Sequence, residues 1–148
     1  MNDIIDFKQV VEMQDKLLPL TDDDLDIVNT FTEGLYSRSG TMRQGSLIIG
    51  HIHKHSCINI MSTGKMIVNM DGVTTTIEAP CVFSSPAGSR KVLLVLEDVT
   101  FTNVHNTETT DLDELRKELV VHEDFLPDLS HIKKELVEYY NEGELICG

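Results

Sequence analysis

The chain has 148 residues, of which 41% are hydrophobic, and its formal net charge is −13 at pH 7. This length and apolar content suffice for one buried core, so the composition excludes a wholly disordered protein. The negative charge argues against nucleic acid or an anionic membrane as the main partner. The cysteines (Cys57, Cys81 and Cys147) form no CxxC pair, so we expect free thiols and a reducing, cytoplasmic setting.

The first segment, residues 1–34, is predicted to be helical. Apolar residues recur at helical spacing over residues 2–18, and Pro19 ends this run. Thr21 and the three aspartates after it offer capping oxygens for a second, short helix. Gly34 is the expected end of that helix.

Between residues 35 and 106, short apolar runs separated by turn residues replace the helical spacing. Asp71-Gly72, between two such runs, is a strong hairpin signal. The expected strands lie at about 35–38, 46–54, 57–61, 65–70, 73–78, 81–84, 91–96 and 99–105. Strands of this number and spacing predict a closed or sandwich-like antiparallel barrel, and local pairing leaves the strand order open.

The last segment, residues 107–148, returns to helical spacing and holds 12 carboxylates against 4 Lys and Arg residues. Thr110-Asp111 can cap one helix, and a second is expected from residues 127–130 to Gly143. We interpret the acidic surface as solvated; the alternative is a docking surface for a basic partner.

Ligand-type side chains occupy every second position from His51 through His53 and His55 to Cys57. On an extended strand all four project from one face. Imidazole and thiolate both bind transition metals, so His51, His53 and Cys57 are candidate ligands. The alternatives are histidines that only line a barrel and a cysteine that acts as a small buried apolar residue.

The spacing from Gly45 through this His-x-His pair to Gly64 resembles the first cupin motif. Cys57 stands where that motif has its glutamate. Pro86-Ala-Gly88 resembles the Pro-x-Gly turn of the second motif. The resemblance covers about residues 35–106 and is strongest to small cupin-like proteins of phage and bacterial genomes. It implies a mainly β, cupin-like jelly-roll barrel with N- and C-terminal helices, located in the cytoplasm of a host or in a virion if phage-encoded.

The second motif departs from the family pattern at Lys91, where its histidine is expected. The resemblance implies that His105, on the last expected strand, replaces that ligand. The alternative for His105 is a surface position at a strand end. The implied metal is divalent zinc, iron, manganese or nickel.

Three residues are candidates for binding a ligand other than metal. His55 has the same parity as the metal candidates, and Arg90 and Lys91 follow the Pro-x-Gly turn. Two cations beside a pocket attract a carboxylate or phosphate, so we expect a small polar or anionic ligand. The alternative is that both are ordinary exposed residues of a turn.

Two classes of function follow. The first is a non-enzymatic cupin-like module that binds or sequesters a small ligand, or serves as a phage accessory or virion protein. The second is a metal-dependent cupin enzyme acting on a small polar organic acid or sugar. Loss of the motif glutamate favours the first class and retention of clustered histidines favours the second, so whether the chain is an enzyme stays open.

We also expect a homo-oligomer, with a dimer as the first expectation. Residues 2–18 carry apolar positions on more than one helical face, and Ile132, Leu136 and Tyr140 form a second apolar stripe. The alternative is a monomer in which both helices fold back over their own barrel.

Overall fold

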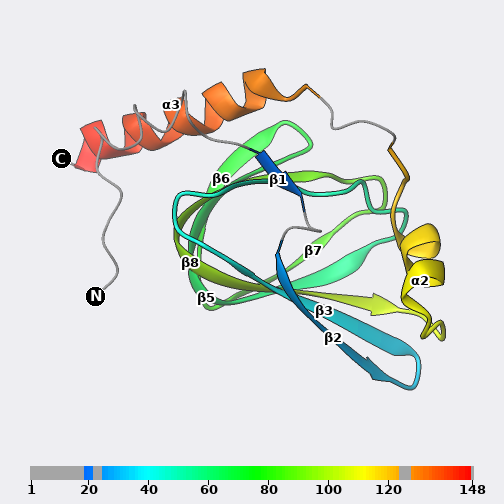
Figure 1. Ribbon diagram of the computed structural model, residues 1–148. Coiled ribbons are helices and arrows are strands. Elements are labelled where there is room, and N and C mark those ends of the chain that lie inside the picture. The colour runs from blue at the N-terminus through cyan, green and yellow to red at the C-terminus, as the bar shows by residue number, and fades with distance from the viewer. Residues whose placement is uncertain (1–18, 22–24, 124–127, 148) are drawn as a thin grey trace.

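The structure, a computed structural model, describes residues 19–21, 25–123 and 128–147. An eight-stranded sheet curls around a buried core, with one helix across its outside and a shorter one at its end (Figure 1). The strands are β1 (Pro19–Thr21), β2 (Asp26–Thr32), β3 (Leu35–Met42), β4 (Leu47–Ile49), β5 (Cys57–Met70), β6 (Val73–Glu78), β7 (Cys81–Ser85) and β8 (Lys91–Asn106). The helices are α2 (Leu112–Leu119) and α3 (Ser130–Cys147).

The two longest strands, β5 and β8, form the centre of the sheet and pair with each other along most of their length. On its other edge β8 pairs first with β4 and then with β3. On its other edge β5 pairs first with β7 and then with β6. All of these pairs are antiparallel, and only β1 with β4 is parallel among the described strands. The mainly β, cupin-like jelly roll is therefore confirmed, but within the described residues the sheet does not close.

The helix expected to end at Gly34 is wrong, because residues 26–32 form β2. This strand pairs with β3 from Asp26–Thr41 to Thr32–Leu35, and Gly34 makes the turn with a φ of 77°. Cross-strand pairing with β3 outweighs the weak local capping signal. The expected helix over residues 2–18 lies outside the described residues.

The single strand expected over residues 46–54 is also wrong beyond Ile49. From Gly50 onward the backbone bonds alternately to two different elements instead of one ladder. The His53 amide donates to the Ser89 carbonyl at 3.1 Å, while the Lys54 amide donates to the Leu119 carbonyl at 2.8 Å. This segment is therefore an irregular bridge between the β7–β8 turn and the end of α2.

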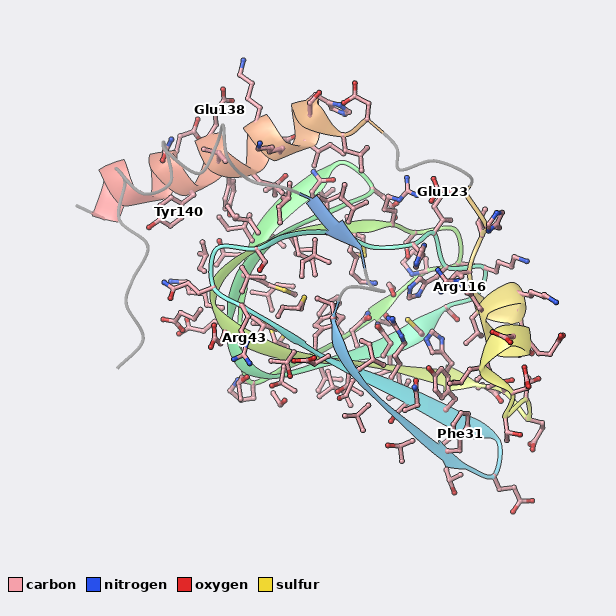
Figure 2. The ribbon with its side chains drawn as sticks, in the orientation of Figure 1. Phe31, Arg43, Arg116, Glu123, Glu138 and Tyr140 are labelled. Atoms are coloured by element: carbon pink, nitrogen blue, oxygen red, sulfur yellow. The ribbon has the colours of Figure 1, made fainter. Side chains whose placement is uncertain are left out.

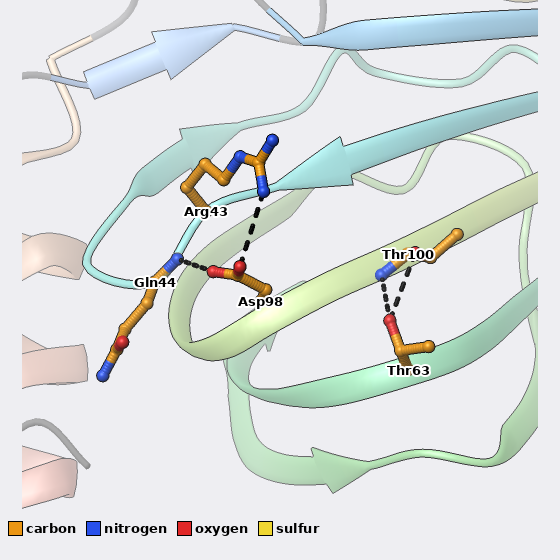
Figure 3. Close-up of polar contacts among 5 residues, drawn as sticks. All are labelled: Arg43, Gln44, Thr63, Asp98 and Thr100. Atoms are coloured by element: carbon orange, nitrogen blue, oxygen red, sulfur yellow. Dashed lines mark hydrogen bonds and ion pairs between the residues drawn. The ribbon is translucent and has the colours of Figure 1, made fainter. Parts of the chain in front are cut away.

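Gly64 marks a bulge in the middle of β5, where the register with β8 shifts. Its φ is +90°, and a Cβ atom there would lie 2.2 Å from the Asp98 carbonyl oxygen, so the position requires glycine. Side chains fix both sides of this bend (Figure 3). Thr63 Oγ1 accepts the Thr100 amide at 3.0 Å, and Asp98 accepts the Gln44 amide at 2.8 Å.

The predicted Asp71-Gly72 hairpin is confirmed. It joins β5 to β6, and both turn residues have positive φ, 51° and 86°. This is the conformation that a two-residue hairpin of this type demands.

Helix α3 packs on the outside of the sheet and buries Leu136, Val137 and Tyr140. Figure 2 shows Tyr140 on the side of α3 toward the sheet and Glu138 on the opposite side. The apolar stripe predicted on this helix thus covers the chain's own sheet. Gly143 does not end the helix, which continues to Cys147. None of the described helices is long and apolar enough to cross a membrane.

Candidate functional site

Three buried ligand-type side chains meet inside the barrel: His53, Cys57 and His105. One donor atom from each lies within 4.8 Å of the others. His53 comes from the irregular segment after β4, Cys57 is the first residue of β5, and His105 lies near the end of β8. Among the described residues this is the one group of three or more His, Cys, Asp or Glu side chains that could hold a metal ion.

Aromatic stacking and a sulfur contact orient the two imidazoles. His53 Nδ1 lies 3.6 Å from Cys57 Sγ. The rings of His53 and His105 have centroids 5.6 Å apart and are tilted by 49°. Tyr36 stacks on the other side of His105, with a centroid distance of 5.9 Å and an angle of 20°. The Tyr36 hydroxyl in turn donates to Asn29 Oδ1 at 2.5 Å, so the stack is fixed from β2 as well.

The surroundings hold both imidazoles in the neutral form. Burial, followed by the positive charge of Lys91, lowers the pKa of His53 from 6.5 to about 3. Burial, followed by Lys91 and Arg38, lowers the pKa of His105 to about 4. The same desolvation that disfavours the imidazolium leaves a nitrogen lone pair for coordination at neutral pH.

A polar network surrounds the Cys57 sulfur. Ser85 Oγ lies 3.3 Å from Cys57 Sγ, and Lys91 Nζ donates to that same Ser85 oxygen at 3.3 Å. On the other side Asn103 Nδ2 contacts the sulfur at 3.9 Å and donates to Asn59 Oδ1 at 2.5 Å. Polar groups that hydrogen-bond to metal-binding side chains orient those side chains, and they are typical of metal sites.

The donor set fits a divalent transition metal. Zinc–nitrogen bonds of about 2.0–2.1 Å and a zinc–sulfur bond of about 2.3 Å put tetrahedral nitrogen and sulfur ligands about 3.5 Å apart. The 3.6 Å between His53 Nδ1 and Cys57 Sγ matches this separation. His105 then needs only a small side-chain adjustment, since its donor atom already lies within 4.8 Å of both.

A cavity of about 480 Å³ opens from the trio toward α2. His53 and His105 lie in its wall, whereas Cys57 is buried and is not part of the lining. Two arginines, Arg38 of β3 and Arg116 of α2, also line it, and Figure 2 shows the Arg116 side chain between α2 and the sheet. The remaining lining residues are Leu25, Ile27, Asn29, Tyr36, His51, Asn103, Leu112, Asp113, Leu115, Leu119 and Val120.

The structure places the other predicted site residues in different surroundings. His51 lines the cavity but lies outside the trio. His55 is exposed in the bend before β5. Arg90 forms an ion pair with Glu123 and donates to the Gly50 carbonyl at 3.2 Å, so it is held away from the cavity. Lys91 is buried and lines the smaller cavity beside His51 and His53.

Arg38 and Asn103 are site residues that the sequence reasoning missed. They are cross-strand neighbours on β3 and β8, so the register brings them together. One signal was present: Tyr36 and Arg38 lie two residues apart within the expected strand 35–38 and therefore share a face. Whether this face of β3 points into the barrel depends on the pairing of β3 with β8.

Several solved structures are similar in fold to part of this chain. The plu4264 protein from Photorhabdus luminescens aligns with a TM-score of 0.52 and 16% identity, over 64% of this chain and 84% of that protein. A Cupin 2 conserved barrel domain protein from Salinispora arenicola aligns with a TM-score of 0.49 and 21% identity, over 56% and 76%. The Cnp3 cupin domain of Schizosaccharomyces pombe aligns with a TM-score of 0.49 and 20% identity, over 63% of this chain and 70% of that domain.

No protein-family model and no curated protein matches the sequence. The likeness is therefore one of fold. Its fold is a cupin-like jelly roll, which is the fold that the sequence motifs indicated.

Proposed function

We propose that this protein is a non-enzymatic binding module that holds a divalent transition metal on His53, Cys57 and His105. The metal takes part in binding a small anionic ligand in the adjoining cavity. The observation that carries the proposal is the convergence of three buried donor atoms within 4.8 Å at the wall of a 480 Å³ cavity.

The chemistry of the donors favours zinc or iron among the candidate metals. Thiolate and imidazole suit these ions, whereas manganese prefers carboxylate and carbonyl oxygens. Three protein ligands leave at least one coordination position for water or a bound molecule. Because His53 and His105 line the cavity, a metal held by them would be within reach of a ligand bound there.

The charge of the cavity walls supports an anionic ligand. Arg38 and Arg116 line the large cavity, Arg38 and Lys91 line the smaller one, and the described lining includes a single carboxylate, Asp113. This local excess of cations contrasts with the net charge of −13 of the whole chain. A carboxylate or phosphate gains charge-assisted hydrogen bonds from such groups, and Arg in particular can bind it through two parallel bonds.

A metal-dependent enzyme acting on a small polar organic acid or sugar is the second candidate. The position of His53 and His105 in the wall of the cavity favours it. A bound divalent ion would supply Lewis-acid polarisation, while the neutral histidines hold it and Arg38 orients an acidic substrate. Turnover of such an acid by the metal-loaded protein would establish this second function over simple binding.

Metal analysis of the purified protein tests the proposal. We expect stoichiometric zinc or iron in the full-length chain, and loss of at least nine-tenths of it in His53→Gln and in His105→Gln. His51→Gln is the matched control, since His51 lies two residues away in the same cavity wall but outside the trio. Equal metal loss in the His51 variant and the His53 variant would contradict the trio. So would a wild-type protein that stays metal-free when zinc and iron are supplied.

A further inference from the structure

The outer face of one half of the sheet is almost free of charge. The face is formed by β2, β3, β8, β5 and β7, whose paired residues stand side by side and point to the same side. One row across it contains Val28, Ser39, Thr102, Ile60 and Val82. The next contains Thr30, Ser37, Val104, Ile58 and Ser84, and the partial rows at either end contain Thr32, Leu35, Asn106, Asp26, Thr41 and Thr100.

Asp26, at one corner, is the single charged residue in these rows, although a quarter of the chain is charged. The apolar members are well exposed: Val82 to 67%, Val28 to 64% and Ile58 to 50%. The hydroxyls of Ser39 and Thr102 hydrogen-bond to each other across β3 and β8. The two hydroxyls in the row from Val28 to Val82 thus satisfy each other, and the exposed surface of that row is largely methyl groups.

The other half of the same sheet shows what a covered outer face looks like in this protein. On β8 the outward residues Val92, Leu94 and Leu96 are buried under α3. Further along the same strand the outward residues are Thr102 and Val104, which are half-buried. Neither described helix lies over this second half: α3 packs on the first half, and α2, at the end of the sheet, packs on Tyr36.

We propose that this uncharged face is a homodimer interface, occupied by the same face of a second copy of the chain. The net charge of the chain favours a second copy over a basic partner as the occupant of this face. With a net charge of −13, two copies repel each other wherever their acidic surfaces approach. A basic partner would instead be attracted to the acidic surface and would find no complementary charge on this face. A neutral face is complementary to itself, which is what a two-fold interface requires.

The size and shape of the face suit this occupant. Five strands about 4.8 Å apart, with outward side chains about 6.8 Å apart along each strand, span roughly 500 Å² in projection. The accessible area of projecting side chains exceeds their projection, which brings the face near the roughly 800 Å² that each partner contributes to a standard interface. Two such faces can stack about 10 Å apart, as sheets do in β-sandwiches.

Solution mass tests the proposal on the full-length protein at high micromolar concentration. We expect twice the chain mass of 16.6 kDa for the wild type. Ile58→Lys, in the middle of the face, should lower it to one chain mass. Val73→Lys is the control: Val73 is also an exposed β-branched residue, at 68% against 50% for Ile58, and it lies on β6, away from this face. Circular dichroism and thermal unfolding confirm that each variant is folded.

A variant without residues 1–18 separates this interface from the alternative based on the N-terminal segment. On the proposal, the shortened chain keeps the mass of a dimer. A wild type that runs as a monomer overturns the proposal, as does an Ile58→Lys protein that remains dimeric. Loss of the dimer on deletion of residues 1–18, with Ile58→Lys unaffected, would overturn it too and assign the contact to that segment.

Discussion

Cys57 Sγ lies 3.6 Å from His53 Nδ1, although the two residues are separated by the bend that leads into β5. This distance makes the cysteine a candidate ligand in the place where the cupin motif has a glutamate. The substitution changes the chemistry of the site, because a thiolate is a softer ligand than a carboxylate. The strongest test of the site is therefore a measurement that detects the metal–sulfur bond itself.

Cobalt substitution provides that measurement. We expect the cobalt-loaded wild type to show a sulfur-to-cobalt charge-transfer absorption in the near ultraviolet, because a thiolate donates directly to the ion. Cys57→Ser should lose this band. Cys81→Ser should keep it, since Cys81 is the other described free cysteine and lies outside the trio. An unchanged spectrum in Cys57→Ser would show that the sulfur is not a ligand.

The pH dependence of stability should report the burial of the two histidines. The pKa of His53 is lowered to about 3 and that of His105 to about 4. As pH falls below about 6.5, the unfolded chain gains a proton at each histidine and the folded chain does not, so the free energy of unfolding decreases. Between pH 6.5 and 5 each histidine should account for a decrease of roughly 1.5 kcal/mol, before most carboxylates titrate.

Urea unfolding of the metal-free protein at pH 7, 6.5 and 5 checks this expectation. His105→Gln should remove about half of the decrease. His131→Gln, at an exposed position on α3, should leave it as in the wild type. If the wild type and His105→Gln lose the same stability over this range, His105 is not held neutral in the folded protein.

Features that depend on a few neighbouring residues could be predicted from the sequence. Asp71-Gly72 specifies its turn locally, and the helix cap at Asp111 forms as expected, with the side chain accepting the Glu114 amide at 3.0 Å. The helix expected to end at Gly34 failed for the opposite reason. Residues 26–32 become a strand because β3 is available as a partner, and no local pattern contains that information.

The candidate site shows the same division. Strand parity grouped His51 with His53, and both line the cavity, although the segment that carries them is irregular and not a strand. Parity could not show that a bend at residues 54–55 brings Cys57 next to His53. It also could not show that His55, in that bend, is exposed. His105 came from the family resemblance. Arg38 enters the site only through the register between β3 and β8, which the sequence leaves open.

Gly64 should be far more sensitive to substitution than Gly72, although both have positive φ. A Cβ at Gly72 meets nothing within 4 Å, so Gly72→Ala should cost only about 1 kcal/mol for the left-handed conformation. A Cβ at Gly64 would overlap the Asp98 carbonyl, and the bend in β5 must then shift. We expect Gly64→Ala to cost roughly 3 kcal/mol or more. Equal midpoints of urea unfolding for the two variants would refute this account of the bulge.

Arg38 should be the main determinant of anion affinity. It lines both cavities beside the trio, and its positive charge helps to lower the pKa of both His53 and His105. A hydrogen bond to a charged group is worth about 1.5–3 kcal/mol, or at least about tenfold in affinity. We therefore expect Arg38→Gln to weaken the binding of malonate or inorganic phosphate by about tenfold or more, measured by titration calorimetry on metal-loaded protein.

Arg43→Gln is the matched control for this measurement. Arg43 follows the same strand, but its side chain is 70% exposed and pairs with Asp98 at 3.5 Å, beside the Gly64 bend rather than in the cavity (Figure 3). The Arg43→Gln variant should bind both anions as the wild type does. This result would separate a direct contact of Arg38 with the anion from a general loss of positive charge. Equal weakening in the two variants would mean that net charge alone attracts the anion. If neither anion binds the wild type, the cations of the cavity do not form an anion site.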